Sequence, residues 1–151
     1  MARISAKEYQ RRLQTILNQS LIERLVAQII MQDKSLKAEK IKEFEYGVRP
    51  DGNRIGQYRN PFYKDFKQRK NPKAGGTVDL ILTGQFINGL YLTSRFKRAF
   101  IFESRDKKSE NLKGKYGMDI MGLNEDFFYN KQKFEYAPLL IIEIKRYANI
   151  G

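Results

Sequence analysis

The chain has 151 residues and a mass of 17.8 kDa, and it contains no histidine, cysteine or tryptophan. These absences exclude Ser-His-Asp and Cys-His catalytic sites, imidazole or thiolate metal sites, and disulfides. Lys and Arg outnumber Asp and Glu by 29 to 17, which gives a formal net charge of +12. Such an excess is typical of proteins that lie against nucleic acid, an acidic protein surface or anionic lipid.

The length suits one domain, which we expect to span residues 1–151 without help from a disulfide or a metal. No stretch approaches the roughly 18 consecutive apolar residues of a membrane helix. Met1-Ala2-Arg3-Ile4 also leads directly into a polar segment, unlike a signal sequence. We therefore expect no signal peptide and no contact with a membrane.

The first predicted element is a long helix from Ser5 to about Gln32, which fills residues 1–33. Ser5-Ala6-Lys7-Glu8 matches the S-x-x-E capping box, and apolar residues recur at three and four positions beyond it. At ~1.5 Å per residue this helix would be about 40 Å long. Since a domain of this size does not require such length, we expect its outer part to pack on a neighbouring subunit.

Residues 44–103 are predicted to hold hairpins and a basic loop. A charged stretch from Asp33 to Lys42, a short helix or a solvated connector, precedes them. Alternation at 44–48 and turn residues at 50–53 predict a β-hairpin over 44–58. Residues 59–76 combine proline, glycine and many cations, which predicts a flexible loop or one that a partner orders.

Further along, Thr77–Leu82 is predicted as a short strand and 85–90 as a brief helix. Tyr91–Ser94 and Phe96–Glu103 are predicted to pair as antiparallel strands, with Phe100 and Phe102 on one face.

Residues 104–151 are predicted to be mainly helical. Asn124 is the expected N-cap of one short helix, and Pro138 is expected at the first turn of another that ends near Asn149. The predicted fold class is α+β, with a long N-terminal helix, a small, mainly antiparallel sheet with hairpins, and short C-terminal helices.

Cations interleaved with aromatic residues indicate a surface that contacts DNA or an acidic partner, because such surfaces track phosphates and stack on bases. The alternative is that the cations are solvated and the aromatic rings pack against the sheet. The candidate contact residues are Arg59, Lys64, Lys67, Arg69, Lys70, Lys73, Arg95, Lys97 and Arg98.

Glu143 and Lys145 form an E-x-K pattern, which occurs in nucleases that hold Mg²⁺ between carboxylates. Such a site needs an aspartate nearby, and the candidates are Asp51, Asp79 and Asp126. A three-residue pattern also arises by chance in a lysine-rich chain, as a salt-bridged helix or strand face. We therefore expect no catalytic residue, no metal and no cofactor, and we retain the nuclease only as an alternative.

Two blocks carry a resemblance to a known class of protein. They are Val78-Asp79-Leu80-Ile81-Leu82-Thr83-Gly84-Gln85-Phe86 and Lys115-Tyr116-Gly117-Met118-Asp119-Ile120-Met121-Gly122-Leu123-Asn124. With the order of elements over residues 40–135, they resemble virion proteins of tailed bacteriophages. The chain looks most like neck or connector proteins of phages of gut bacteria, including the crAss-like group. More loosely it is similar to tail-completion and head-to-tail joining proteins, although it lacks their usual histidine and proline-rich closing segment.

The resemblance implies a structural protein and no enzyme. Copies would form a ring, usually of twelve, on the portal or beside other neck and tail proteins, and would extend the channel for the encapsidated DNA. The protein would be located in the virion neck and assembled in the host cytoplasm. The implied subunit contacts are Thr83, Gly84, Phe86, Tyr116 and Gly117. A free-standing basic nucleic-acid-binding protein remains the other alternative.

Overall fold

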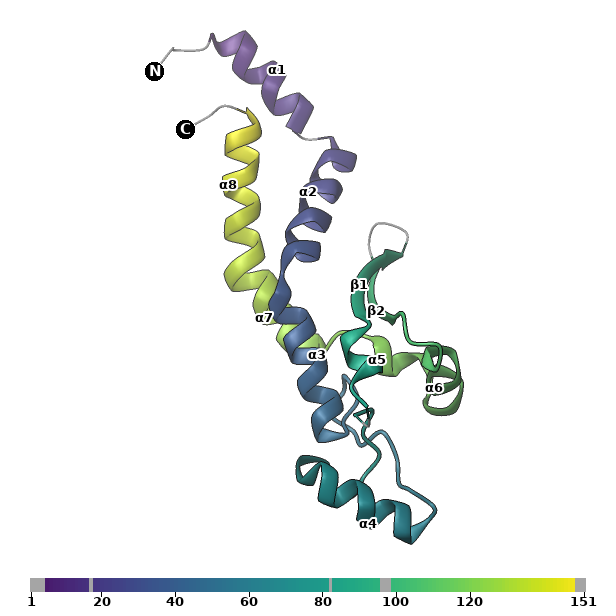
Figure 1. Cartoon of the computed structure of the whole chain (residues 1–151). Coiled ribbons are helices and arrows are strands. Elements are labelled where there is room, and N and C mark those ends of the chain that lie inside the picture. The colour runs from purple at the N-terminus through teal and green to yellow at the C-terminus, as the bar shows by residue number, and fades with distance from the viewer. Residues whose placement is uncertain (1–4, 17, 82, 96–98, 149–151) are drawn as a thin grey trace.

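The N-terminal part of the chain consists of three successive helices in the computed structural model, which describes residues 5–16, 18–81, 83–95 and 99–148. They are α1 (Ala6–Ile16), α2 (Gln19–Gln32) and α3 (Lys34–Tyr46) (Figure 1). The predicted start is confirmed, because Glu8 N–H donates to Ser5 Oγ over 3.2 Å.

The prediction of one continuous N-terminal helix is wrong, because an N-cap at Asn18 divides it into α1 and α2. A further N-cap at Asp33 lies just after the predicted end at about Gln32 and starts α3. Asn18 Oδ1 accepts the Ser20 N–H over 3.0 Å, and Asp33 Oδ1 accepts the Ser35 N–H over 2.8 Å. Each cap has an extended backbone, so the helical ladder stops there and begins again with a new direction. The N-terminal helices are therefore short.

The C-terminal end forms the long helical element of the chain, where short helices were predicted. α7 (Glu125–Lys131), the π-helical turn η3 (Gln132–Tyr136) and α8 (Ala137–Ala148) follow one another directly. Asn124 caps this element as predicted, since its Oδ1 accepts the Phe127 N–H over 2.8 Å.

Pro138 lies in the first turn of α8, which ends at Ala148, as predicted, but α8 continues directly from the preceding π turn and does not begin as a separate helix. Proline has no N–H and its ring would collide with a carbonyl of the preceding turn. The π turn widens the ladder just before it, with the Ala137 N–H bonded to the carbonyl of Gln132, and so lets the helix continue.

The predicted strand pair is confirmed as one antiparallel hairpin, and Leu92 lies opposite Phe102. β1 (Leu90–Arg95) and β2 (Ala99–Ser104) are the strands of a two-stranded sheet. The described part of the chain is therefore mostly helical α+β, with less sheet than predicted.

The predicted hairpin over 44–58 is wrong in its first strand, because α3 continues through Tyr46. Gly47 ends the helix with φ of 65°, and a Cβ atom there would lie 2.6 Å from the Val78 carbonyl oxygen. Beyond it, single bridges pair Val48 with Arg54 and Gln57 with Thr77. The strand predicted from Thr77 onward therefore amounts, in its described part, to one bridge.

The predicted loop at 59–76 is largely helical, as α4 (Pro61–Lys70) and the 3-10 turn η1 (Pro72–Ala74). Asn60 Oδ1 accepts the Tyr63 N–H over 3.1 Å and Pro61 occupies the first turn, which together start the helix. The remaining helices are α5 (Gln85–Asn88), α6 (Ser109–Tyr116) and the 3-10 turn η2 (Met118–Met121).

Figure 1 shows an extended molecule, with α1, α2 and α8 at one end and α4 at the other. Arg12 on α1 donates to the carbonyl of Ala148 over 3.0 Å, so a cation caps the C-terminal end of α8.

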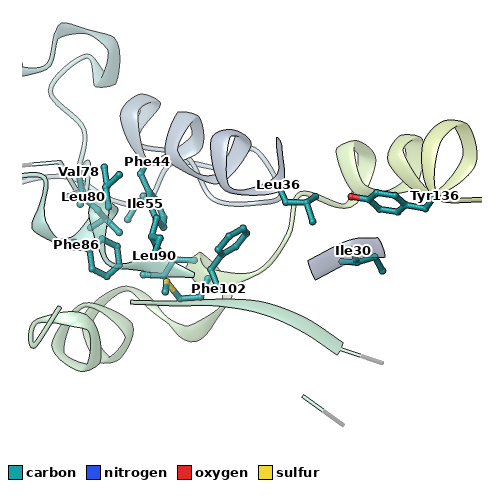
Figure 2. Packing of buried hydrophobic residues seen from close by; sticks show 13 residues of the cluster. Ile30, Leu36, Phe44, Ile55, Val78, Leu80, Phe86, Leu90, Phe102 and Tyr136 are labelled. Carbon is teal, nitrogen blue, oxygen red and sulfur yellow. The ribbon is translucent and has the colours of Figure 1, made fainter. Parts of the chain in front are cut away.

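The buried apolar side chains lie in a row along the middle of this shape. Figure 2 shows the order from Val78, Leu80 and Phe86, past Phe102 and Leu36, to Ile30 and Tyr136.

A buried ion pair lies within this row. The side chains of Lys40 and Glu43 on α3 are 1% and 5% exposed and are bonded to each other, and Lys40 Nζ also donates to the Ile120 carbonyl over 3.2 Å. Burial lowers the pKa of Lys40 and raises that of Glu43, against the attraction between them. The pair ties η2 to α3.

A second polar cluster joins the start of α3 to the C-terminal helix. Asp33 accepts the Tyr136 O–H over 2.6 Å and lies 3.1 Å from Lys131 Nζ. Burial alone would raise the pKa of Asp33, but hydrogen bonds from Ser35, Tyr136 and Lys131 outweigh it and lower the pKa to about 2.

Replacing Asp33 by Asn should remove a pH-dependent contribution to stability. The carboxyl pKa is about 2 in the folded chain and about 3.9 in an unfolded one. Its contribution is therefore complete above about pH 4 and is lost as pH falls through about 2. Urea unfolding of both proteins should show a difference in unfolding free energy at neutral pH that shrinks toward zero in acid. A difference independent of pH would contradict this assignment.

Candidate assembly and nucleic-acid surfaces

A groove of about 870 Å³ lies where the start of α4, residues 79–86 and the end of α6 meet. Its lining residues are Gln57, Tyr58, Arg59, Asn60, Tyr63, Lys67, Asp79, Leu80, Thr83, Gly84, Phe86, Asp106, Lys108, Leu112, Lys115 and Tyr116. The two sequence blocks that carry the phage resemblance therefore meet in one groove, although about 30 residues separate them along the chain.

The free charge of this groove is positive. Asp79 is paired with Lys67, whereas Asp106 Oδ1 accepts the backbone N–H of Lys108 over 2.9 Å and keeps its negative charge, which the three other lining cations outnumber. Within the described residues, no carboxylate forms an ion pair with the side chains of the three other lining cations, which are Arg59, Lys108 and Lys115. Lys115 Nζ lies 5.1 Å from the centre of the Tyr116 ring.

Lys67 and Asp79 form the polar floor of the groove. Lys67 Nζ lies 2.5 Å from Asp79 Oδ1 and 2.6 Å from the Ile81 carbonyl oxygen, and both side chains are at most 2% exposed. Asn71 donates to the other Asp79 oxygen over 3.1 Å. Tyr58 O–H bonds the Asp79 backbone, and burial raises the pKa of this phenol. The network fixes residues 79–81 against α4.

The predicted contact cations are thus divided by the structure. Lys67 is too deeply buried to reach a partner, which corrects its place in the predicted set. Lys73 is exposed but bonds Glu45 over 2.7 Å, a contact that raises the pKa of Lys73. Arg59, Lys64, Arg69 and Lys70 lie on or beside α4, and Lys64 is partly buried. The side chain of Arg95, and Lys97 and Arg98 entirely, lie outside the described residues.

Four of the five predicted subunit-contact residues line the groove: Thr83, Gly84, Phe86 and Tyr116. Phe86 is only 5% exposed and packs on Phe44, so it belongs to the core and cannot make a subunit contact. Gly117 ends α6 with φ of 96°.

Sequence reasoning missed Lys108 and Lys115 as members of this site. The available signal was the charged stretch 104–115, but only the fold brings its end beside residues 79–86.

The most conspicuous surface lies elsewhere, on α8. Leu139, Ile141, Ile142 and Tyr147 are 46%, 55%, 51% and 54% exposed. Five of the six residues 139–144 are apolar, and because successive residues are ~100° apart such a run covers every side of a helix. In the described part of the chain, α1 and α2 pack on α8 and leave these four side chains about half exposed. Contiguous exposed apolar surface of this kind marks a site of protein–protein contact.

Two of the candidate nuclease residues bond other side chains. Glu143 on α8 bonds Arg146 over 2.7 Å, and Asp79 is committed to Lys67. Within residues 5–16, 18–81, 83–95 and 99–148, no three acidic side chains lie close enough to hold a metal ion. In the same residues, no helix has the length and apolar character to cross a membrane.

Comparison with protein-family models, curated proteins and solved structures finds no match for this chain.

Replacing Lys67 by Met should destabilise the protein far more than Lys70→Met on the same helix. The first change leaves the Asp79 carboxylate buried without its cation, which costs about 3–5 kcal/mol. The second removes an exposed charge and should cost less than about 0.5 kcal/mol. Urea unfolding measures both values.

The double variant Lys67→Met with Asp79→Asn serves as the matched control, since it removes both charges. It should recover part of the lost stability. Equal effects of the two single changes, or no recovery in the double variant, would contradict the role given to the pair.

Proposed function

We propose that the chain is a structural subunit of the head-to-tail connector of a tailed bacteriophage, where copies form a ring between the portal and the tail. The observation that carries the proposal is the apolar surface of α8, which the fold leaves about half exposed on Leu139, Ile141, Ile142 and Tyr147. An apolar helix of this kind is stable in water when further protein covers it. A repeated subunit supplies that cover.

The extended shape favours the same conclusion. The body around α3 and the hairpin holds most of the core, whereas α1, α2 and α8 project from it (Figure 1). Projecting helices with uncovered apolar sides suit a subunit that reaches its neighbours.

The charge distribution supports a place beside DNA or an acidic protein. Arg59, Lys108 and Lys115 face the groove, and exposed cations continue along α4 at Arg69 and Lys70. Cations at such positions neutralise phosphates or carboxylates of a partner. The resemblance of residues 78–86 and 115–124 to phage connector proteins gives this partner its proposed setting, a channel that carries the genome.

A basic nucleic-acid-binding protein is the second candidate, favoured by the tyrosines that accompany the groove cations. Tyr58, Tyr63 and Tyr116 all line the groove, and aromatic rings beside cations suit bases and phosphates. On this reading the isolated monomer should bind DNA, with an affinity that falls steeply as salt rises.

Measurement of particle mass by sedimentation, with negative-stain images of the same sample, tests the proposal. We expect a closed ring of defined copy number, twelve by analogy with the resembling proteins. Ile142→Glu should shift the protein toward monomer, because a charge would then lie in the apolar contact. Met118→Glu is the matched control, since Met118 is 49% exposed on η2, away from α8. A wild-type chain that remains monomeric at high concentration and binds DNA would contradict the connector and favour the second candidate.

A further inference from the structure

The groove between α4, residues 79–86 and α6 has the size and the lining of a ligand site. Its volume is about 870 Å³, and pockets that hold small ligands measure roughly 300–1,000 Å³. Four cations and two carboxylates line it, and two of these charges, Lys67 and Asp79, neutralise each other in its floor. A net positive charge therefore faces the open part of the groove, where it attracts an anionic group.

The remaining cations approach the groove from two sides. Arg59 precedes α4, whereas Lys108 and Lys115 belong to α6 and its N-cap, and all three are exposed. Lys108, Leu112 and Lys115 are spaced by four and three positions, so they share the face of α6 that lines the groove. At ~1.5 Å per residue the two lysines are about 10 Å apart along the helix axis. Exposed cations arranged in this way neutralise phosphates.

Three tyrosines supply aromatic surface beside these cations. The Tyr58 hydroxyl donates to the Asp79 carbonyl and accepts from the Asp79 N–H, which holds its ring in place. The Tyr63 ring packs edge-to-face on it, with ring centres 5.1 Å apart, and is 40% exposed. Tyr116 lies on the α6 side, next to Lys115. Rings that are already fixed offer stacking surface at little cost in conformational entropy.

We infer that this groove binds a nucleotide whose base is unpaired, with its phosphate beside Arg59, Lys108 or Lys115 and its base on a tyrosine ring. The nucleotide is free or is one unit of a single strand, and the chemistry of the contact is the same in both. The inference goes beyond the proposed ring, because the groove is complete within one copy and requires no neighbour.

Duplex DNA does not suit this groove. Its bases are stacked inside, and a protein reads them by inserting a helix or a β-ribbon into a groove of the DNA. The tyrosines here line a concave surface of the protein, so they can stack only on bases that have left a duplex or never formed one.

Fluorescence anisotropy with a short labelled oligothymidylate tests the stacking contact. Tyr63→Ala should weaken strand binding about tenfold, the effect of one lost stacked base, and Tyr63→Phe, which keeps the ring, should not. Phe62→Ala is the matched control, because Phe62 is 86% exposed on the same helix and does not line the groove. None of these changes should alter the affinity for a hairpin duplex. Circular dichroism checks that each variant folds.

The salt dependence of the same binding tests the phosphate contact. Lys108→Gln should weaken strand binding and reduce the slope of log affinity against log salt by about 0.7, the value for one phosphate of a single strand. Lys107→Gln is the control, since Lys107 is a neighbouring exposed lysine that does not line the groove. Competition with thymidine monophosphate identifies the source of the nucleotide: displacement of the strand indicates a free nucleotide, and no displacement indicates the strand.

The outcomes separate this inference from the proposed function. If Tyr63→Ala and Lys108→Gln weaken strand binding no more than their controls do, or if neither the strand nor the mononucleotide binds, the inference is overturned. A ring seen by sedimentation would leave the connector proposal standing in that case. A monomer that binds the strand through this groove would instead overturn the ring and support the inference.

Discussion

Two buried lysines hold the irregular segments of this protein against its helices. Lys40 bonds Glu43 and the carbonyl of Ile120, and Lys67 bonds Asp79 and the carbonyl of Ile81. In each case the ammonium group bonds a carboxylate and also a backbone oxygen. That backbone oxygen belongs to a segment outside the α-helices and the hairpin. With only a two-stranded sheet among the described residues, segments 79–81 and 118–121 have few ladder bonds to position them. The basic groove depends on the second of these anchors.

The anchors also change the meaning of the charge excess. A cation that is 2% exposed beside a carboxylate contributes to folding and not to partner binding, so part of the 29 Lys and Arg residues is structural. The cations left without carboxylate partners in the groove, Arg59, Lys108 and Lys115, come from segments far apart in sequence. They form a basic surface only because α4 and α6 meet the residues between them.

Local signals in the sequence predicted local structure well. The caps at Ser5 and Asn124 and the hairpin of β1 and β2 are where the sequence places them, because each depends on residues within a few positions. The internal cap at Asn18 was hidden by a continuous apolar periodicity, and the Asn60-Pro61 start of α4 was hidden by the loop-like composition around it.

Burial and ion pairing that depend on residues far apart in the sequence could not be predicted from these local patterns. Nothing near Lys67 marks it as buried, because its carboxylate lies twelve positions away and reaches it only through the fold. Phe86 was likewise assigned to a subunit contact because it belongs to the block at 78–86, and only the fold shows that it packs on Phe44. The apolar run on α8 was visible, but its exposure follows from how little of α8 the helices α1 and α2 cover.

The central claim is that the uncovered surface of α8 is buried in an assembly. Because the chain has no cysteine, Ile142→Cys introduces one thiol on that surface, and Asn111→Cys introduces one on α6 as the reference. The rate of thiol labelling is measured for both variants from dilute to concentrated protein. We predict that labelling at residue 142 slows steeply as the protein assembles, while labelling at residue 111 does not change. Equal rates for residue 142 at all concentrations would contradict it.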